Sequence, residues 1–352
     1  MENYENHDDE ELIRFIEASK PKILVVGVGG SGSNTINRMH EINIEGAKLV
    51  AINTDAAHLL KIKSHAKVLL GKKITKGLGA GSDPKLGEEA AIESKEEIRH
   101  LLQDAHLVFL TCGLGGGTGT GAIPIVAHEA KELGALTIAV VTLPFSSEGK
   151  TRMKNALEGL EKLKKETDTV IIIPNDKLLV ITPDLPLNTA FKVSDEILAN
   201  ATKGIIEMVT KPGMANIDFA DLRSVLKDSG YAVIGSGEAR APSGEERALT
   251  VVENTLRSPL LDVDISTAKK ALVNIIGGPD LTLREAERIF KEISNKISED
   301  ALLKWGARIE NGMPRDLVKI LVVLSGVSFR DYARELKKEA ILDDEDIEKV
   351  FG

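Results

Sequence analysis

The chain of 352 residues is poor in several features that mark common protein classes. Its single cysteine, Cys112, excludes an intramolecular disulfide and suits a reducing compartment. Aromatic residues make up only 3% of the chain and the net charge is −9 without a strong basic block, which argues against binding of nucleic acid. No apolar run approaches the roughly 20 residues that a membrane span needs. These absences predict a cytoplasmic protein that neither binds nucleic acid nor inserts into a membrane.

The most informative segment that is present is the glycine-rich run 113–121 (GLGGGTGTG). Glycine loses too much backbone entropy to favour a helix or strand interior, so the run predicts a loop. The apolar residues 105–111 before it predict a buried strand, and residues 122–133 after it predict a helix with Pro124 in the first turn. Consecutive backbone N–H groups at the positive end of a helix dipole form a site suited to phosphate. Cys112 borders this loop, where a buried filler role is favoured over that of a catalytic thiol.

The first half of the chain alternates apolar runs with amphipathic segments such as 33–40 and 150–165. This pattern predicts an α/β fold with a parallel sheet that helices cover on both faces. In such sheets ligands bind at the carboxyl ends of the strands. The predicted strands are 22–26, 48–52, 68–70, 107–111, 136–142 and 169–174.

The second half begins after a long helical pattern, 189–210, that Lys211-Pro212-Gly213 ends. Beyond it, apolar runs and amphipathic segments predict a second, smaller α/β domain. We therefore predict an N-terminal extension with a short amphipathic helix (1–20), a nucleotide-binding domain (21–190), a central helix with an acidic loop (191–223), a C-terminal α/β domain (224–330) and a short tail (331–352). The predicted strands of the second domain are 231–235, 271–277, 307–310 and 317–325, and its helices are 244–257 and 283–296.

A second glycine loop, GVGGSGSN at 27–34, follows the first predicted strand. It fits the dinucleotide fingerprint G-x-G-x-x-G, and Asp55 follows the next strand at about the expected distance, so alone it favours an NAD-dependent oxidoreductase. A dinucleotide needs one pyrophosphate loop, however, and two glycine loops at neighbouring strand ends suit a longer phosphate chain. A P-loop is excluded because no G-x-x-x-x-G-K-[ST] occurs.

Residues 115–121 (GGGTGTG) resemble the signature loop of the tubulin/FtsZ superfamily. Further blocks match that family in order, and together they extend over about residues 21 to 330. The last of them is similar to FtsZ, the prokaryotic cell-division GTPases, rather than to tubulin. The resemblance implies a parallel-sheet GTP-binding domain joined by a long central helix to a smaller α/β domain. The blocks are GVGGSGSN (27–34), NTDA (53–56), GLGAGSDP (77–84), PFSSEGKTR (144–152), IPNDKLL (173–179) and NIDFADLR (216–223).

The resemblance also implies which residues hold the phosphates of GTP or GDP. The glycine loops would supply backbone N–H groups, and Thr118 and Thr120 would add hydroxyl donors. The charge of the triphosphate predicts Mg²⁺, which usually keeps several waters. No direct metal ligand is predicted; Asp55 could hold a metal-bound water or cap the following helix, and both readings stay open. The predicted set is Gly29, Gly30, Ser31, Gly32, Ser33, Asn34, Asp55, Ala80, Gly81, Gly115, Gly116, Gly117, Thr118, Gly119, Thr120 and Gly121.

The nucleoside end of the site is implied in the same way. Glu148 and Arg152 match family residues that contact the ribose and the nucleotide edge, and Asn175, Phe191 and Asp195 match the guanine pocket. The chemistry fits guanine, because the Asp195 carboxylate can accept from both N1–H and the exocyclic amino group. Phe191 precedes it by about one helical turn and can lie over the base.

The acidic segment NIDFAD carries Asn216, Asp218 and Asp221. Alone, the two carboxylates favour solvation or helix capping. The resemblance implies instead that they enter the nucleotide site of the next subunit and polarise the attacking water, with Asp221 leading and Asn216 positioning water or phosphate. The chain would then be an assembly-dependent GTPase forming head-to-tail filaments and a division ring. The alternative, a shape-control polymer with incidental hydrolysis, is disfavoured by the intact acidic segment.

The C-terminal region shows neither a long linker nor an obvious terminal peptide for a membrane-tethering adaptor protein. Residues 330–340 predict a short helix, and 343–351 are a weak candidate for docking such an adaptor. The resemblance nevertheless implies that the protein acts at the division site.

Overall fold

The computed structural model describes residues 20–181, 186–261, 263–329 and 350. The predicted N-terminal helix, the helix predicted at 330–340 and nearly all of the candidate docking peptide 343–351 lie outside the described residues.

Within the described residues, ten strands form one sheet in the order β3-β2-β1-β4-β5-β6-β7-β10-β8-β9. The strands from β3 to β6 pair in parallel, as the alternating pattern predicts. β7, β10 and β8 pair antiparallel, and β9 lies parallel to β8 at the sheet edge. The bounds are β1 Ile23–Val28, β2 Lys48–Asn53, β3 Ala66–Leu69, β4 Leu107–Gly113, β5 Leu136–Leu143, β6 Thr169–Pro174, β7 Gly230–Arg240, β8 Lys270–Gly277, β9 Leu302–Ile309 and β10 Leu317–Ser325.

Two hydrophobic cores lie on the two faces of this sheet. Alternate residues of one strand enter different cores, as Val25 and Val26 of β1 do, because successive side chains point to opposite faces. α2 (Gly29–Glu41), α3 (Ala56–Lys61), α8 (Asn175–Ile181), α9 (Leu187–Thr210) and α10 (Phe219–Leu226) cover one face. α4 (Pro84–Glu93), α5 (Lys95–Leu102), α6 (Thr118–Glu132), α7 (Lys150–Glu166), α11 (Glu245–Leu256) and α12 (Leu283–Ser294) cover the other.

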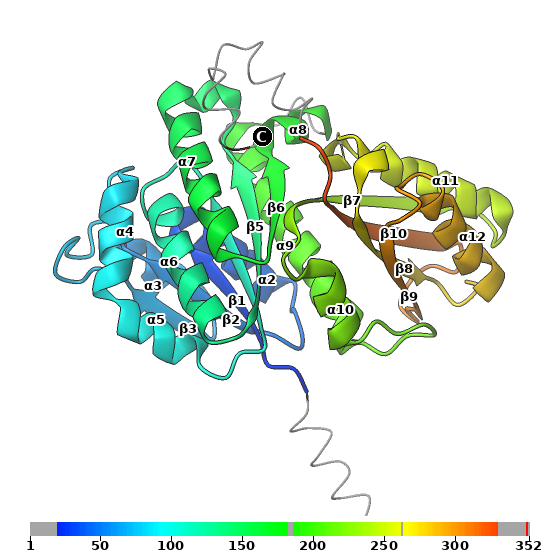
Figure 1. Cartoon of the computed structure of the whole chain (residues 1–352), viewed down its shortest axis with the longest axis horizontal. Helices are drawn as coiled ribbons and strands as arrows, with labels where there is room; N and C mark the ends of the chain where they lie inside the picture. The colour runs from blue at the N-terminus through cyan, green and yellow to red at the C-terminus, as the bar shows by residue number, and fades with distance from the viewer. Residues whose placement is uncertain (1–19, 182–185, 262, 330–349, 351–352) are drawn as a thin grey trace, which may run out of the picture.

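The long helix α9 stands between the two halves of the chain (Figure 1). It begins at Leu187, before the predicted start of the central segment at residue 191. The two halves also share the sheet, because β6 and β7 pair in parallel at three successive positions, beginning with Thr169 beside Gly230. The second domain is thus an extension of the sheet of the first, on the far side of α9.

Two helix starts predicted from the glycines are wrong. α2 begins at Gly29 and not at Ser33, and α6 begins at Thr118 and not at residue 122, so Pro124 lies inside α6 and not in its first turn. Glycine propensity predicted loops there, but tertiary packing decides the outcome. A Cβ on Gly121 would collide with the Pro84 carbonyl oxygen of α4, so the glycines allow helix backbones to touch.

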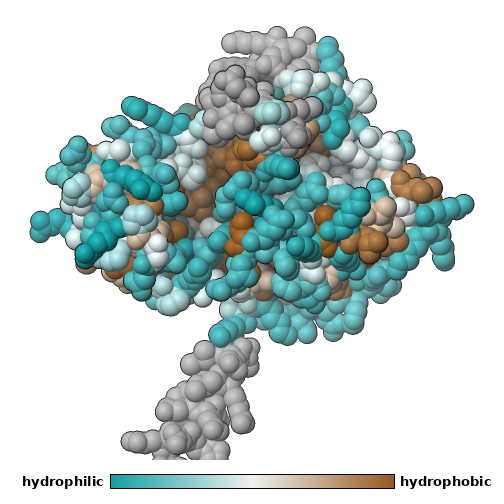
Figure 2. Space-filling model, turned by 180° about the vertical axis from the view of Figure 1, so that it is seen from behind, coloured by the Kyte–Doolittle hydropathy of each residue, from teal (hydrophilic) through white to brown (hydrophobic). Residues whose placement is uncertain are grey.

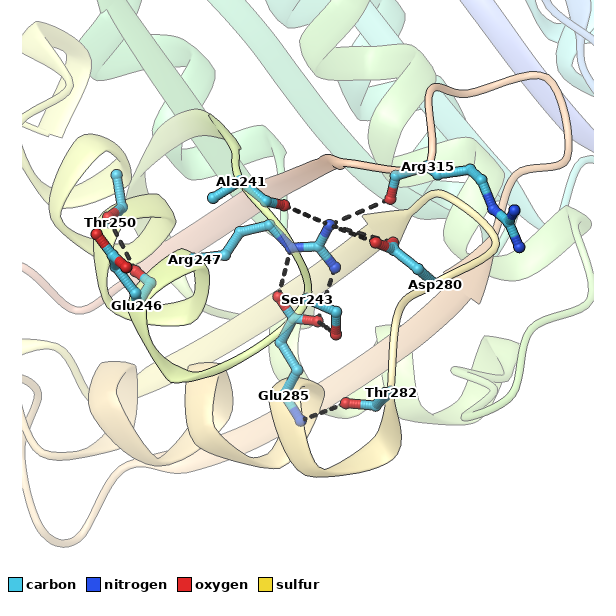
Figure 3. Close-up of polar contacts among 9 residues, drawn as sticks. All are labelled: Ala241, Ser243, Glu246, Arg247, Thr250, Asp280, Thr282, Glu285 and Arg315. Carbon is cyan, nitrogen blue, oxygen red and sulfur yellow. Dashed lines mark hydrogen bonds and ion pairs between the residues drawn. The ribbon is translucent and has the colours of Figure 1, made fainter.

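A buried ion-pair cluster holds the second half together (Figure 3). The Arg247 guanidinium of α11 is fully buried and donates from Nε to Glu285 Oε1 of α12 at 2.6 Å. Its Nη1 donates to Asp280 at 3.1 Å and to the carbonyl oxygens of Ala241 and Arg315 at 3.1 and 3.2 Å. Because this buried charge is paired and hydrogen-bonded, it ties two helices to three loops without an unsatisfied charge.

The face of the molecule opposite to that of Figure 1 is mainly hydrophilic, with hydrophobic side chains gathered in smaller patches (Figure 2). Among the described residues, none of the helices combines the length and apolar character that crossing a bilayer requires.

Candidate functional site

A pocket of about 540 Å³ opens at the carboxyl ends of the parallel strands, where the alternating pattern places a ligand. The segments after β1, β2, β4, β5 and β6 all contribute to its lining, and the first turns of α9 close one end. Its volume lies within the range of roughly 300–1,000 Å³ that is typical of small-molecule sites.

The two glycine loops meet at the floor of this pocket. Gly29 adopts φ +75°, and a Cβ there would lie 2.7 Å from the Gly119 backbone nitrogen. Only glycine fits this contact, which brings the N-terminal ends of α2 and α6 together. Both helix dipoles therefore present positive ends and backbone N–H groups to the same pocket, which suits a chain of phosphates.

The two threonines of the glycine run 113–121 form hydrogen bonds within the protein. The Thr118 hydroxyl lies 2.6 Å from that of Thr54 and lines the pocket. The Thr120 hydroxyl is buried and accepts a hydrogen bond from the Gly115 N–H at 2.8 Å. Thr120 therefore holds the shape of the loop, away from the pocket lining, whereas Thr118 faces the pocket.

The structure brings most of the predicted nucleotide-binding residues to one cavity. Their role in binding GTP stays a prediction. Several of the predicted glycines lie behind the lining, where they permit close backbone packing. The pocket lining includes Gly30, Ser31, Asn34, Asp55, Ala80, Gly81, Gly116, Gly117, Thr118, Gly119, Glu148, Arg152, Asn175, Phe191 and Asp195, and it does not include Gly29, Gly32, Ser33, Gly115, Thr120 or Gly121.

The predicted guanine end is formed where α9 approaches α2. The Thr35 hydroxyl donates to Asp195 Oδ1 at 3.2 Å, and the Ser194 hydroxyl donates to Asn175 Oδ1 at 3.0 Å. Phe191 packs edge-on against Phe145, with ring centroids 5.5 Å apart, and is 38% exposed, which leaves ring surface for a base. Burial raises the pKa of Asp195 to about 7, although hydrogen bonds from Thr35 and Ser31 oppose the rise. A purine amidine edge that donates two hydrogen bonds would stabilise the ionised carboxylate here.

Glu148 and Arg152 lie at the edge of the same pocket and pair with each other. The Arg152 Nε lies 3.1 Å from Glu148 Oε2, and the Phe145 N–H donates to Glu148 Oε1 at 2.9 Å. The segment that follows β5 thus holds Glu148, and Glu148 in turn holds Arg152. The resemblance implies that this edge of the pocket contacts the ribose.

The position of Asp55 is compatible with both of its predicted roles, capping α3 and holding a metal-bound water. Asp55 caps α3 by accepting from the His58 N–H at 2.9 Å, and it also lines the pocket. Capping is therefore observed, and a carboxylate oxygen directed at a metal-bound water is compatible with it. No group of three or more potential metal ligands occurs among the described residues.

Sequence reasoning missed several pocket residues, of which His58 and Asn53 are the most polar. His58 Nε2 lies 3.0 Å from Asn34 Oδ1 and its Nδ1 lies 3.2 Å from Asn53 Nδ2, so this side chain connects α2 with the end of β2. Asn53 opens the block NTDA, which was a usable signal, and His58 follows Asp55 by three residues on α3. Gly79, Ser82 and Ser194 also line the pocket.

The acidic segment lies elsewhere in the chain, after the end of α9, a helix of 24 residues that is about 36 Å long. Asp218 caps α10 by accepting from the Asp221 N–H at 2.7 Å, and Asn216 Oδ1 accepts from the Gly213 N–H at 2.6 Å. Asp221 forms an ion pair with Lys304 at 2.8 Å. None of these three predicted catalytic residues lines the nucleotide pocket of its own chain.

Cys112 is fully buried in β4. Burial raises the pKa of its thiol far above the ordinary value, so the thiolate that a nucleophile requires is not formed near neutral pH. The geometry therefore favours the filler role.

Two glycine loops that face one polar pocket, a long helix behind it and a second α/β half define a nucleotide-binding protein of the tubulin/FtsZ class. Family models match both halves: "Tubulin/FtsZ family, GTPase domain" matches residues 22–183, and "FtsZ family, C-terminal domain" matches residues 230–328. The chain belongs to the FtsZ family.

Curated relatives extend the match over most of the chain. Cell division protein FtsZ 1 of Thermococcus kodakarensis is 54% identical over 338 residues, which cover 96% of this chain and 89% of the relative. Cell division protein FtsZ 1 of Methanocaldococcus jannaschii is 53% identical over 323 residues, which cover 92% and 88%.

Solved structures agree with this. An empty FtsZ dimer from M. jannaschii superposes with a TM-score of 0.85 at 53% identity, covering 91% of this chain and 92% of that one. The GTPγS-bound protofilament of CetZ2 from Haloferax volcanii has a TM-score of 0.77 at 23% identity, covering 91% and 100%, and shares the fold.

These matches confirm the predicted fold class and the prediction of an FtsZ-type GTPase. They support it over both the shape-control polymer and the NAD-dependent oxidoreductase. The match to the GTPase domain indicates that the chain binds GTP and GDP and hydrolyses GTP.

Proposed function

We propose that this chain is a cell-division GTPase that assembles head-to-tail and hydrolyses GTP only where two subunits meet. The observation that carries the proposal is the separation of the nucleotide pocket from the acidic segment by α9. The names of the relatives, cell division protein FtsZ 1 and an FtsZ dimer, support both division and self-association.

The carboxylates of the pocket itself are already engaged. Asp55 caps α3, Glu148 is held by Arg152 and a backbone N–H, and Asp195 lies at the end assigned to guanine. A group that orients the attacking water beside the terminal phosphate must then come from outside the subunit. Asp218 and Asp221 of a neighbour provide this when the α10 end of one chain meets the pocket of the next.

The chemistry needs little beyond position and charge. Phosphoryl transfer depends mainly on positioning and on electrostatic stabilisation of the phosphates, which the two glycine loops and helix ends supply. Mg²⁺, when bound, neutralises phosphate charge, and Asp55 is the residue placed to hold one of its waters. Asn216 positions water or phosphate, while Asp221, aided by Asp218, polarises the water.

Contact between two different ends of the molecule is heterologous, and its rotation need not close, so it produces filaments. GTP at the joint favours assembly, and its hydrolysis weakens the joint. In the cell we expect these filaments to form a ring at the division site, tethered to the membrane by an adaptor protein, for which 343–351 remain the candidate docking segment.

The decisive measurement is the rate of GTP hydrolysis per subunit, with Mg²⁺, over a wide range of protein concentrations. We expect almost no turnover below a threshold and a steep rise above it, with polymer appearing at the same threshold by light scattering. A rate per subunit that does not depend on concentration would mean that each chain carries a complete site.

Replacing Asp221 with alanine tests the role of the acidic segment. We expect hydrolysis per assembled subunit to fall by about 100-fold, because the water loses its orienting carboxylate, while GTP affinity and assembly remain largely intact. Phosphate release, equilibrium GTP binding and pelleting measure the three properties. Glu253→Gln, which removes an exposed carboxylate from α11, is the matched control. Loss of GTP binding in Asp221→Ala would show that the residue acts within its own chain.

A further inference from the structure

The edge strand β9 holds the acidic segment from one side. Lys304, Gly306 and Arg308 follow one another at every second position of β9, so their side-chain positions share one face of the sheet. That face meets the segment between α9 and α10, and Figure 1 shows α10 beside the β8–β9 edge.

The middle of this contact is backbone and close packing. The N–H groups of Met214 and Ala215 donate to the Ala307 carbonyl oxygen at 2.8 and 3.1 Å, and the Ala307 N–H donates back to Ala215 at 3.0 Å. A Cβ on Gly306 would lie 3.1 Å from the Ile217 side chain, so Ile217 packs directly on β9. The segment that carries the acids is therefore fixed to β9.

An ion pair stands at each end of this contact, and the two differ in exposure. Arg308 pairs with Glu207 of α9 at 2.5 Å, and both side chains are at least nine-tenths buried. Lys304 pairs with Asp221 at 2.8 Å, with side-chain exposures of 38% and 29%. The first pair fixes the strand to the long helix inside the molecule, whereas the second lies at the surface that carries the acids.

The position of the Lys304 pair matters because of the charges that must meet there. If Asp218 and Asp221 enter a neighbour's pocket, two carboxylates approach a bound triphosphate, and like charges repel each other. Lys304 forms an ion pair with Asp221. The hydrogen bond to Asp221, attraction to Asp221 and, to a smaller extent, attraction to Asp218 raise the pKa of Lys304. The same contact lowers the pKa of Asp221, so the carboxylate enters the joint ionised.

Resting on the proposed split site, we propose that Lys304 is a positioning residue of the GTPase reaction. Its ammonium holds the Asp221 carboxylate in place at the subunit end, and it carries a positive charge into the joint together with the two acids. The positive charge reduces repulsion from the neighbour's phosphates during assembly, and the fixed carboxylate orients the water after assembly.

The test compares Lys304→Met, which keeps the length of the side chain and removes the charge, with Lys304→Arg, which keeps the charge. We expect Lys304→Met to bind GTP as the wild type does, to raise the assembly threshold about fivefold at low salt, and to lower turnover per assembled subunit by a similar factor. Lys304→Arg should restore both properties in large part. Because exposed charges are screened, the difference in threshold should shrink between 50 and 500 mM KCl.

Lys162→Met is the matched control. It removes a more exposed lysine from a 2.7 Å ion pair between α7 and α4, with Glu88 as the partner, and the change in net charge is the same. An equal shift of the threshold in this variant would reduce the effect to net charge and overturn the role of Lys304. A Lys304→Met defect that is unaffected by salt and not rescued by arginine would overturn it as well.

A mixing experiment tests whether the defect of Lys304→Met lies at the end of the subunit that carries the acidic segment. Asp195→Ala is expected to lose GTP binding but keeps its acidic segment and Lys304, whereas Lys304→Met keeps its pocket. Together they form one intact joint, so the mixture should hydrolyse GTP faster than the sum of its components. No gain on mixing would contradict the assignment. If the wild type itself shows a rate independent of concentration, the split site fails and this inference fails with it.

Discussion

Asp195 shows how the environment of one residue couples nucleotide recognition to pH. Its carboxyl group is half-buried beside Thr35 and Ser31, and burial raises its pKa to about 7. Near neutrality the empty pocket therefore contains both the protonated and the ionised form. Only the ionised form accepts two hydrogen bonds from guanine, so GTP binding should displace a proton.

We predict that the affinity for GTP falls as the pH is lowered from 8 to 6, by about tenfold, since the ionised fraction of a group with a pKa near 7 falls by that factor. Titration with a fluorescent GTP analogue measures it. Asp195→Asn should bind more weakly and lose this dependence, and it also corrects for titration of the triphosphate itself. Equal slopes in the two proteins would contradict the assignment.

The raised pKa of Asp195 also makes the stability of the fold depend on pH. A carboxyl group whose folded-state pKa exceeds its unfolded value stabilises the fold in its protonated form, and this contribution is lost as the pH rises from about 4 to about 7. Thermal unfolding of the nucleotide-free wild type and of Asp195→Asn should therefore diverge over this range, with the wild type losing more stability. Parallel curves would show that the group is not perturbed.

At the scale of elements, some glycines of the run 113–121 allow helices to pack closely, whereas others line the pocket. Gly121 lies at the first turn of α6 against the Pro84 carbonyl of α4 and does not line the pocket. Gly116 lines the pocket, and a Cβ added there would meet nothing within 4 Å. The two glycines thus serve different purposes within one motif.

We predict that Gly121→Ala lowers the free energy of unfolding by about 1–3 kcal/mol, because α4 and α6 must move apart. Gly116→Ala should leave unfolding nearly unchanged and weaken GTP binding, because its methyl group occupies space beside the phosphates. Urea unfolding and equilibrium GTP binding distinguish the two effects. The reverse pattern would mean that the roles are exchanged.

At the scale of the whole molecule, a continuous sheet and a long helix connect a pocket at one end with an acidic segment at the other. The second half must be rigid for its acids to be useful to a neighbour, and the buried Arg247–Glu285 pair contributes to that rigidity. Arg247 reaches α12 and three loops, so its removal leaves the Glu285 carboxylate buried without its cation.

We predict that Arg247→Met destabilises the protein by about 3–5 kcal/mol, which is the usual cost of leaving a buried partner charge unpaired. Arg257→Met, which breaks an exposed i,i+4 pair with Glu253 on the same helix, should cost less than about 1 kcal/mol. Denaturant unfolding of both variants gives the comparison. A similar loss in the two would mean that the buried cluster contributes no more than a surface pair.

Patterns within the chain were enough to predict the class of fold and most of the residues of the site. Apolar runs that alternate with amphipathic segments predicted the parallel sheet, because local patterning reports which faces are buried. Glycine runs at two strand ends predicted a phosphate site, and seven ordered blocks carried the resemblance to FtsZ. Most of the pocket lining was contained in those blocks. Phe191 and Asp195 lie outside them but were implied by the resemblance, whereas His58, Thr142 and Ser194 were missed.

Which glycines face a ligand and which face another helix follows from the packing of the folded chain and could not be predicted. Gly121 and Gly116 are indistinguishable in sequence, because glycine itself carries no side chain whose chemistry could tell packing from binding. The structure alone also paired Lys304 with Asp221 and Arg247 with Glu285, since contacts between residues far apart in the chain depend on how strands and helices are placed. The helix starts at Gly29 and Thr118 could not be predicted either, because close packing outweighs the weak helix propensity of glycine.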